Sequence, residues 1–370
     1  MKNKSGAFSG PPGDTIAQAP THAAERLVSM RFRRGRGAAI KLSRRQRRLI
    51  GELSTLMAAE HALVHGPCVC GESTGSIISH AERYGLALDT RMCAACGTLR
   101  IDPYLSESCL AQFYVRFYQE LYARVDDPQA YFGRQYDYGR RVLAWAQARI
   151  PSGSWVVEIG CGAGGGLAAF QEAGYRVTGY DYASELLEHG RQASVPDLHF
   201  GGIESLSRAV GADEKIDLML LHHVFEHLAD PLAFLLQATR LLSDRGIILI
   251  AVPDIARIDE YRDRRYNLRG YLHVGHKFNF TINGLDALAT RVGLQASTVD
   301  LEPSTQSPEL WVAYARNAVG APAADAIAYD SADALYQHLR RMEKSYLRRE
   351  SFRRIGWHIR QTVRSWMEKD

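Results

Sequence analysis

The chain has 370 residues, of which 46% are hydrophobic and 23% are charged, so it can bury a core in about two domains. No run of about 18 apolar residues could span a bilayer, and the first twenty residues lack the apolar stretch of a secretory signal, so we expect a cytoplasmic, reducing location. Residues 1–50 hold 12 Lys or Arg against 2 acids and residues 337–370 hold 10 against 4, which leaves an acidic body and excludes a uniformly cationic nucleic-acid binder.

The sequence divides into four expected segments. Residues 1–50 form a basic tail with little fixed structure, because few apolar residues there could pack, although a short helix should begin near Leu42. Residues 51–130 form a small cysteine-bearing module with helices, and residues 131–320 form an α/β domain. Residues 321–370 form a basic, amphipathic helical extension.

Four cysteines of the module have the spacing of a metal site. Cys68-x-Cys70 is followed after 22 residues by Cys93-x-x-Cys96. Four soft thiolates favour Zn²⁺ and leave no open coordination position, so we expect a structural site. Because the first pair is tighter than the usual C-x-x-C, His65 could replace one of its members, and unpaired buried thiols are the other alternative.

Helical periodicity follows over residues 107–122 and 134–149. The first of these helices carries an aromatic stripe at Phe113, Tyr114, Phe117, Tyr118 and Tyr122. Such a stripe either packs in the core or lies against a bound acceptor, and core packing is the simpler interpretation.

From Ser154 onward, short β-rich runs alternate with helical stretches, which is typical of a mostly parallel sheet with helices on both faces. Strands are expected over residues 155–159, 176–180, 198–200, 218–221 and 246–252. Two later stretches, residues 295–301 and 310–315, flank a polar turn at 303–307 and should pair as an antiparallel hairpin.

A glycine-rich turn follows the first strand directly, in the sequence EIGCGAGGG that begins at Glu158. Such a turn lets a ligand approach the backbone, and the next helix begins with free N–H groups. Asp181 ends the next strand, where a carboxylate can accept both ribose hydroxyls of an adenosine-containing ligand. The turn also satisfies G-x-G-x-x-G, so a nicotinamide dehydrogenase is a rival, and a tight turn without a ligand is the structural alternative.

The fourth strand ends in a histidine-rich segment, HHVFEHLADP, over residues 222–231. A base at this edge could remove a proton from an acceptor, and His223, Glu226 and His227 are the candidates. The same residues could instead close over a ligand, brace the next helix or hold a metal ion. A second such segment, YLHVGHKFNFT, ends at Thr281, which should cap the helix that follows.

Four features occur in order along the chain: Glu158, the glycine turn, the H-V-x-E-H-x-x-D-P segment and the terminal hairpin. Together they resemble class I S-adenosylmethionine-dependent methyltransferases over about residues 138–317. The cysteine segment is similar to the zinc-bearing N-terminal module of bacterial methyltransferases that act on sugars and glycans. The resemblance implies a Rossmann-like, seven-stranded sheet with an antiparallel last strand, and a cofactor across the carboxyl ends of the first strands.

The resemblance also implies roles for single residues. The implied S-adenosylmethionine contacts are Glu158, Gly160, Gly162 and Gly164 at the methionine part, with His222 beside them, Asp181 at the ribose, and Gly202 and Ile203 at the adenine. The implied base is His227, with His223 and Glu226 as further candidates. The implied acceptor contacts are Tyr271, His273 and His276, and the implied ligands of structural Zn²⁺ are Cys68, Cys70, Cys93 and Cys96.

We therefore expect methyl transfer to a sugar or glycan, on oxygen rather than carbon. The alternatives are an RNA methyltransferase that uses the basic ends and a methyltransferase-like fold that binds cofactor or partner without turnover. Nucleic acid is disfavoured as a partner because no recognised RNA- or DNA-binding module accompanies the basic charge.

The last helix is amphipathic, with arginines among apolar residues at helical spacing: Phe352, Ile355, Ile359, Val363 and Trp366. It could dock on its own protein, on a partner or peripherally on an anionic membrane.

Overall fold

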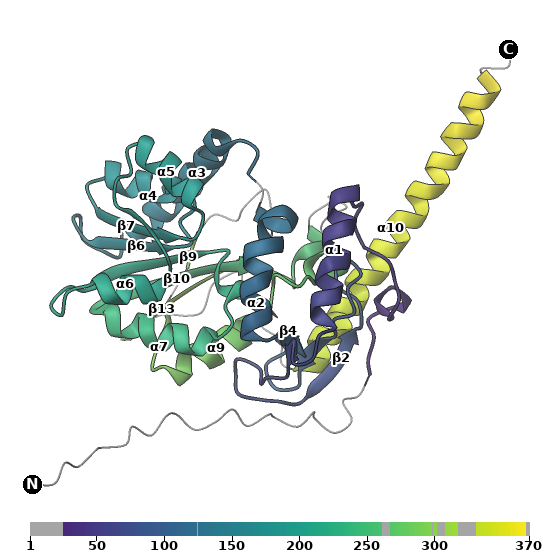
Figure 1. Ribbon diagram of the computed structural model, residues 1–370, viewed down its shortest axis with the longest axis horizontal. Coiled ribbons are helices and arrows are strands. Elements are labelled where there is room, and N and C mark those ends of the chain that lie inside the picture. The colour runs from purple at the N-terminus through teal and green to yellow at the C-terminus, as the bar shows by residue number, and fades with distance from the viewer. Residues whose placement is uncertain are drawn as a thin grey trace, which may run out of the picture.

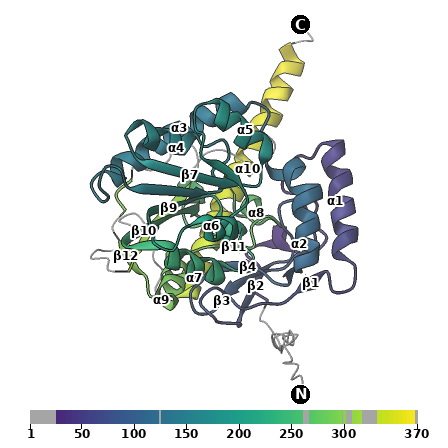
Figure 2. The same ribbon diagram turned by 60° about the vertical axis from the view of Figure 1, so that its left-hand side comes forward.

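The computed structural model describes residues 25–123, 125–260, 267–297, 299–301, 308–316 and 331–367. An α/β domain lies beside a smaller N-terminal module, and a long C-terminal helix extends away from both (Figure 1). The module's helices α1 (Arg44–Met57) and α2 (Glu107–Phe113) stand side by side next to the α/β domain (Figure 2).

A seven-stranded sheet forms the centre of the α/β domain, in the order β12-β13-β10-β9-β6-β7-β8. The strands are β6 (Trp155–Ile159), β7 (Arg176–Asp181), β8 (Leu198–Phe200), β9 (Ile216–His222), β10 (Leu242–Pro253), β12 (Gln295–Ser297) and β13 (Glu309–Ala315). β13 runs antiparallel to both of its neighbours, whereas β10, β9, β6, β7 and β8 are parallel. The predicted sheet with an antiparallel last strand is confirmed, and the predicted turn at 303–307 lies outside the described residues.

The sheet is covered by helices on both faces (Figure 1). Successive residues of β6 point to opposite faces. Val156 is buried under one group of helices, and Val157 is buried under a second group on the other face. The first group is α3 (Pro128–Ala146), α4 (Gly165–Glu172) and α5 (Ser184–Gln192), and the second is α6 (Ile203–Ala209), α7 (Pro231–Leu241) and α9 (Ile282–Arg291). A ligand therefore approaches this sheet at the edge where the parallel strands end.

Side-chain caps set the starts of two helices at that edge. Asp230 opens α7, and its Oδ1 accepts a hydrogen bond from the N–H of Ala233 at 2.9 Å. Thr281 opens α9, and its Oγ1 accepts from the N–H of Gly284 at 3.1 Å, as the sequence predicts. Both caps lie at the carboxyl ends of the histidine-rich segments, so they fix where those segments pass into helices.

The N-terminal module holds a four-stranded antiparallel sheet in the order β11-β4-β3-β2 and a separate two-stranded ladder. Its strands are β1 (Leu63–Val64), β2 (Gly75–Ser79), β3 (Thr90–Cys93), β4 (Leu99–Ile101), β5 (Tyr104–Leu105) and β11 (Phe278–Asn279). Strand β11 belongs to the loop that follows β10 of the α/β domain, and it pairs with β4. The second histidine-rich segment is therefore anchored to the module.

Helix α2 continues as a π-helix, η2 (Tyr114–Ala123). Phe113, Phe117 and Leu121 are buried against α1, so core packing accounts for this part of the predicted aromatic stripe. Tyr114, Tyr118 and Tyr122 form a half-buried row instead, with successive ring centroids 5.1 and 5.7 Å apart. π-helical turns are rare and frequent at functional sites, which draws attention to this row.

The segment from Glu25 to Ser43 packs against the module, whereas the sequence predicts little fixed structure up to residue 50. Val28 and Phe32 are buried beside β2, around the short 3₁₀ helix η1 (Met30–Phe32). Arg31 forms an ion pair with Glu343 of the C-terminal helix at 2.9 Å. Composition does not reveal these contacts, because few apolar side chains take part and ion pairs and backbone hydrogen bonds to distant residues make up the rest.

Helix α10 (Ala332–Met367) is the predicted C-terminal helix. Leu335, Leu339 and Met342 bury its first turns against α8 (Leu268–Tyr271) and η4 (Ile258–Glu260). The rest of the helix extends away from the body (Figure 1). The predicted apolar stripe falls mainly on side chains after Phe352, which lie outside the described part of the chain. Among the described residues, no helix combines the length and apolar character needed to cross a membrane.

Candidate active site and thiol cluster

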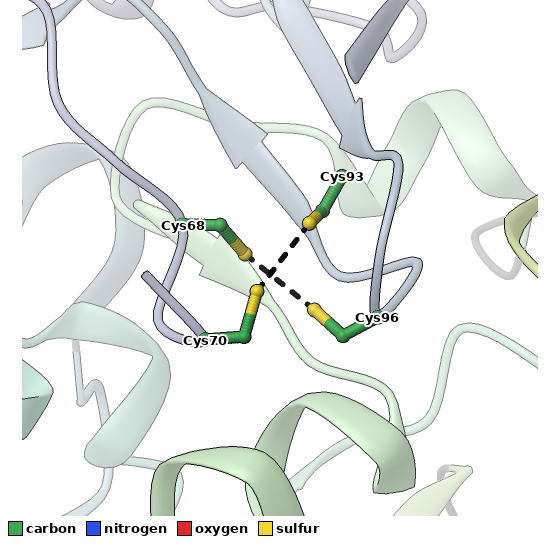
Figure 3. Close-up of side chains that lie close together, drawn as sticks. All are labelled: Cys68, Cys70, Cys93 and Cys96. Atoms are coloured by element: carbon green, nitrogen blue, oxygen red, sulfur yellow. Dashed lines mark hydrogen bonds between the residues drawn. The ribbon is translucent and has the colours of Figure 1, made fainter. Parts of the chain in front are cut away.

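Four cysteine side chains of the module point toward one another (Figure 3). The Sγ atoms of Cys68 and Cys96 are 3.6 Å apart, those of Cys70 and Cys93 are 3.5 Å apart, and all four lie within 4.8 Å of one another. Thiolates bound to Zn²⁺ at about 2.3 Å stand about 3.8 Å apart in a tetrahedron, so the sulfur positions fit such a site. The hydrogen-bonded thiols Cys93 and Cys96, and then burial, raise the pKa of Cys68, and a bound cation would offset this effect.

The four predicted cysteines assemble without His65. The Nδ1 atom of His65 lies 2.9 Å from Oδ1 of Asp102 instead. Cys109 and Cys161 are buried in two other cores.

The thiol cluster also braces helix α9 of the α/β domain. The Oγ1–H of Thr281 donates to the carbonyl oxygen of Cys96 at 2.8 Å, and Arg291 donates to the carbonyl oxygen of Val69. Both ends of α9 are therefore tied to cysteine-bearing loops, which indicates a structural role for the cluster.

The glycine turn after β6 adopts a backbone that favours glycine. Gly160, Gly162 and Gly164 have φ angles of 76°, 56° and 73°. A Cβ atom on Gly160 would also lie 2.2 Å from Val224, and one on Gly162 would lie 2.7 Å from the hydroxyl of Tyr131. Conformation and space together exclude side chains at these glycine positions.

Two polar side chains hold the turn in place. Oε1 of Gln135 accepts from the N–H of Ala163 at 3.1 Å, which ties α3 to the turn. Oδ2 of Asp181 accepts from the N–H of Gly162 at 2.8 Å, and its Oδ1 accepts from Ala183 at 2.7 Å. A carboxylate accepts about four hydrogen bonds, so Asp181 keeps acceptor capacity for the two hydroxyls of a ribose.

Glu158 is a buried carboxyl group at the end of β6, with only 1% of its surface exposed. The hydroxyl of Tyr138 donates to its Oε1 at 2.9 Å, and its Oε2 has no hydrogen-bond partner among the described atoms. Burial raises the pKa of Glu158 to about 8, although the bond from Tyr138 opposes this. An ammonium group placed beside Oε2 would satisfy the carboxylate, and the amino group of methionine is such a partner.

The predicted adenine contacts, Gly202 and Ile203, lie at the start of α6. The side chain of Ile203 is 3% exposed and packs in the core, so a contact with adenine falls to the backbone. Tyr182 and Phe200 form an exposed aromatic pair nearby, with ring centroids 5.5 Å apart. A Cβ on Gly202 would lie 3.0 Å from the Tyr182 hydroxyl, so this pair offers a flat face for a purine ring at the expected place.

His222, His223, Glu226 and Glu309 form a connected polar group at the carboxyl end of β9. His223 places Nδ1 3.3 Å from Oε1 of Glu226 and Nε2 3.2 Å from Oε1 of Glu309. Burial disfavours the charged form of His223, but the hydrogen bonds with these two glutamates prevail and raise its pKa to about 10. In Glu309 the bonds from His222 and His223 likewise outweigh burial and lower the pKa of the carboxyl.

The ring of His222 packs beside two aromatic rings, whose own centroids are 5.9 Å apart. Its centroid is 4.1 Å from that of Tyr138 and 5.4 Å from that of Trp311. Its Nε2 is 3.4 Å from Oε1 of Glu309, and burial lowers its pKa, which favours the neutral ring. The side chain is thus directed to Glu309, so a cofactor contact at His222, as the sequence predicts, would have to come from its backbone.

His227 is the last residue of the 3₁₀ helix η3 (Phe225–His227). A hydrogen bond fixes the tautomer of its imidazole ring. Its Nδ1 lies 2.6 Å from the carbonyl oxygen of Gly275, so Nδ1 carries the proton and Nε2 keeps its lone pair. Burial lowers the pKa of His227, although Glu226 and the bond to Gly275 oppose this. The ring is therefore neutral near pH 7, as a general base requires.

The aromatic row of η2 borders this histidine. The hydroxyl of Tyr114 donates to the carbonyl oxygen of His227 at 3.2 Å, and the ring of Tyr118 meets the imidazole edge-on with centroids 5.7 Å apart. Tyr122 stacks on His273 at 4.7 Å. The N-terminal module thus supplies one wall of the candidate active site.

The structure brings two of the three predicted acceptor contacts together. The rings of His273 and His276 lie 3.7 Å apart, and Nε2 of His276 is 3.8 Å from Oε1 of Glu226. Burial lowers the pKa of both histidines far below the usual value, so both rings are neutral. Tyr271 is buried instead in the core that α8 forms with α10, because it lies in the last turn of α8.

Sequence reasoning missed Glu309, Gln135, Tyr138 and Tyr182. Glu309 lies 86 residues after His223, and no spacing pattern connects the two. Tyr182 could have been found, because it directly follows Asp181 and is an aromatic residue at a strand end.

Comparison with known proteins agrees with this geometry. Residues 132–299 match the family described as Methyltransferase domain. A probable S-adenosylmethionine-dependent methyltransferase of Mycolicibacterium smegmatis is 30% identical over 118 residues, 31% of this chain and 44% of that protein. A ubiquinone biosynthesis O-methyltransferase of Paracidovorax citrulli is 26% identical over 159 residues, 42% of this chain and 63% of that protein. The chain thus spans about half the length of the curated relatives that it matches.

Solved structures that match part of the chain include the plantazolicin methyltransferase BpumL in complex with a monoazolic desmethylPZN analog and S-adenosylhomocysteine. It is 16% identical, with a TM-score of 0.42, over 55% of this chain and 92% of that one. An amino pentose methyltransferase from Micromonospora echinaspora is 18% identical, with a TM-score of 0.38, over 51% of this chain and 95% of that one.

The sheet order with one antiparallel strand, the glycine turn with Glu158 and Asp181, and the family match over residues 132–299 agree with one another. The chain therefore contains a class I S-adenosylmethionine-dependent methyltransferase domain.

Proposed function

We propose that this protein transfers a methyl group from S-adenosylmethionine to a hydroxyl of a sugar or glycan, with His227 as the general base. The observation that carries the proposal is the fixed tautomer of His227, whose Nε2 lone pair lies at the same sheet edge as the glycine turn. Oxygen is favoured over carbon because O-methyltransferases are among the matched relatives.

The residues at the carboxyl edge fit S-adenosylmethionine. The unpartnered Oε2 of Glu158 would receive the amino group of its methionine part, and Asp181 would hold its ribose. Gly160 leaves the backbone of the turn without a side chain of its own, since a Cβ there would lie 2.2 Å from Val224. Tyr182 and Phe200 would lie beside its adenine. When bound, this cofactor supplies the methyl carbon, to which the acceptor oxygen forms its new bond as the carbon–sulfur bond breaks and its electron pair stays on sulfur.

The proton of the acceptor hydroxyl goes to Nε2 of His227. This nitrogen can accept it because Nδ1–H is already committed to the carbonyl of Gly275. Glu226, with Oε1 3.9 Å from Nε2, stabilises the imidazolium that forms. Positioned general bases of this kind contribute about 10² to 10⁴ in rate.

The wall that faces His227 supports a sugar-like acceptor. Tyr118 offers a half-buried aromatic ring, and His273 and His276 lie largely buried behind it as neutral imidazole groups. Aromatic faces pack on the C–H faces of sugar rings, while neutral imidazoles can donate to or accept from hydroxyl groups. Radiolabelled S-adenosylmethionine with a panel of nucleotide sugars and polysaccharide fragments tests this, and transfer to RNA with none to any glycan would contradict it.

The thiol cluster is proposed to hold one structural Zn²⁺ ion. Its four sulfur atoms fill a tetrahedral shell, which leaves no open position for an acceptor. The ion would lock the cysteine-bearing loops against α9 through Thr281 and Arg291.

The C-terminal helix is proposed to contact an anionic membrane peripherally. It extends away from the body (Figure 1), and residues 337–370 hold 10 basic residues against 4 acids. Phe352, at the outer end of its described side chains, is 74% exposed. A basic helix with exposed aromatic residues binds such surfaces, which would bring the enzyme to a lipid-linked glycan.

A further inference from the structure

Two histidines and a glutamate at the carboxyl edge of the sheet have the composition of a second metal site. His222 and His223 lie at the end of β9, and Glu309 begins β13, with β10 between the two strands. One nitrogen of each histidine and one oxygen of Glu309 all lie within 4.8 Å of one another. Two imidazoles and one carboxylate are a donor set that suits divalent transition metals.

The distances fit a single ion. Nε2 of His222 is 3.4 Å and Nε2 of His223 is 3.2 Å from the same oxygen of Glu309. Donors about 2.1 Å from one ion are about 3.0 to 3.4 Å apart at octahedral and tetrahedral angles. The ion would need little movement of these side chains.

Two other side chains, Glu226 and Trp311, hold the proposed metal ligands in their orientation. Nδ1 of His223 is 3.3 Å from Oε1 of Glu226, and the indole N–H of Trp311 donates to Oε2 of Glu309 at 3.1 Å. Carboxylates behind ligand imidazoles and donors behind ligand carboxylates are the usual outer shell of metal sites. Glu226 is 1% exposed and its Oε2 has no hydrogen-bond partner among the described atoms, so negative charge lies directly behind His223.

The group is open on one side. The side chains of His222 and His223 are 22% and 34% exposed, whereas that of Glu309 is 5% exposed. Three protein ligands with open positions are typical of catalytic sites, in contrast to the closed shell of the four cysteines. An oxygen of the acceptor could occupy an open position.

A neighbouring triad of Glu226, His227 and His276 fits an ion less well. Its nitrogen atoms lie 3.9 and 3.8 Å from Oε1 of Glu226, which is longer than one ion requires. The Nε2 atom of His227 is also needed for the proton of the acceptor.

We propose that His222, His223 and Glu309 bind one divalent transition-metal ion that coordinates the acceptor oxygen. This inference rests on the proposed methyl transfer and deepens it, because a bound cation lowers the pKa of a coordinated hydroxyl and so prepares its proton for His227. The metal-free alternative is a protonated His223 held between Glu226 and Glu309.

The test uses Co²⁺ and the full-length protein after dialysis against a chelator. Equilibrium dialysis should show one Co²⁺ fewer per chain in His222→Ala and in the nearly isosteric Glu309→Gln than in the wild type. His199→Ala removes an exposed histidine outside the group and should keep the wild-type number. Charge-transfer absorption from thiolates to Co²⁺ reports on the cysteines separately and should be the same in all four proteins.

Equal Co²⁺ binding by the wild type and both site variants overturns the metal proposal and leaves the ion-paired His223 in its place. Calorimetry with S-adenosylhomocysteine on the same samples shows that the variants are folded. It also separates the two proposals: a wild type that does not bind S-adenosylhomocysteine contradicts the methyltransferase function, whatever its Co²⁺ content.

Discussion

The Nδ1–H of His227 is hydrogen-bonded to the carbonyl oxygen of Gly275 at 2.6 Å, and this bond joins two distant parts of the chain. Gly275 lies in the loop that ends in β11, which is the edge strand of the module's sheet. The N-terminal module therefore helps to set the tautomer of the proposed base, in addition to covering it with Tyr118.

Replacement of His227 by alanine should lower kcat by about 10²- to 10⁴-fold, because the acceptor proton loses its base. Cofactor affinity should stay within about twofold of the wild type, because none of the proposed cofactor contacts is made by His227. Turnover assays and calorimetry with S-adenosylhomocysteine measure the two effects, with His199→Ala as the control. Undiminished turnover in His227→Ala would remove this residue as the base.

The pH dependence of the reaction should reflect the lowered pKa of His227. Burial lowers this pKa from the ordinary value of 6.5, so the ring is neutral and active above that range and gains a proton only under acidic conditions. We expect kcat at saturating cofactor and acceptor to fall only as the pH drops below the ordinary histidine value of 6.5, and to be flat above about pH 7. A profile that still rises above pH 7 would contradict a neutral His227.

The strands could be predicted because parallel strands covered on both faces read as continuous apolar runs. In β6 all five residues from Trp155 to Ile159 are buried, and the sequence places this strand at the same residues. The glycine turn could be predicted for a related reason, since its positive φ angles and close contacts leave glycine as the residue that fits.

The partners of the histidines could not be predicted, because tertiary contacts create them. Glu309 meets His223 across the sheet, and Tyr118 reaches His227 from another module. Periodicity also could not separate Tyr118 from Phe117, since both belong to one aromatic stripe and only packing assigns one to the core and one to the site.

Asp181→Ala should weaken binding of S-adenosylhomocysteine at least tenfold. The substitution removes the proposed ribose acceptor and also the carboxylate that accepts from the N–H of Gly162 in the turn. Asp213→Ala, at an exposed position, is the matched control and should bind as the wild type does. Calorimetry measures both proteins, and equal affinities would place the ribose elsewhere.

Removal of residues 1–24 and 352–370 should abolish flotation with vesicles that contain phosphatidylserine. The full chain should float with them at low salt and less at high salt, because screening weakens the attraction of the basic ends. Neutral phosphatidylcholine vesicles are the control. If the full chain stays at the bottom of the gradient with both kinds of vesicle, the membrane proposal fails.

Cys93→Ser should lower the zinc content by one ion per chain and destabilise the fold by at least about 3 kcal/mol, because metal binding at such sites contributes directly to folding. The loss of stability should affect α9, because the cysteine-bearing loops hold this helix through Thr281 and Arg291. Cys109→Ser is the matched control, since this thiol is equally buried but lies in a separate core. Mass spectrometry of metal content and denaturant unfolding measure both variants. Equal zinc content in the two variants would show that the four thiols do not hold the ion.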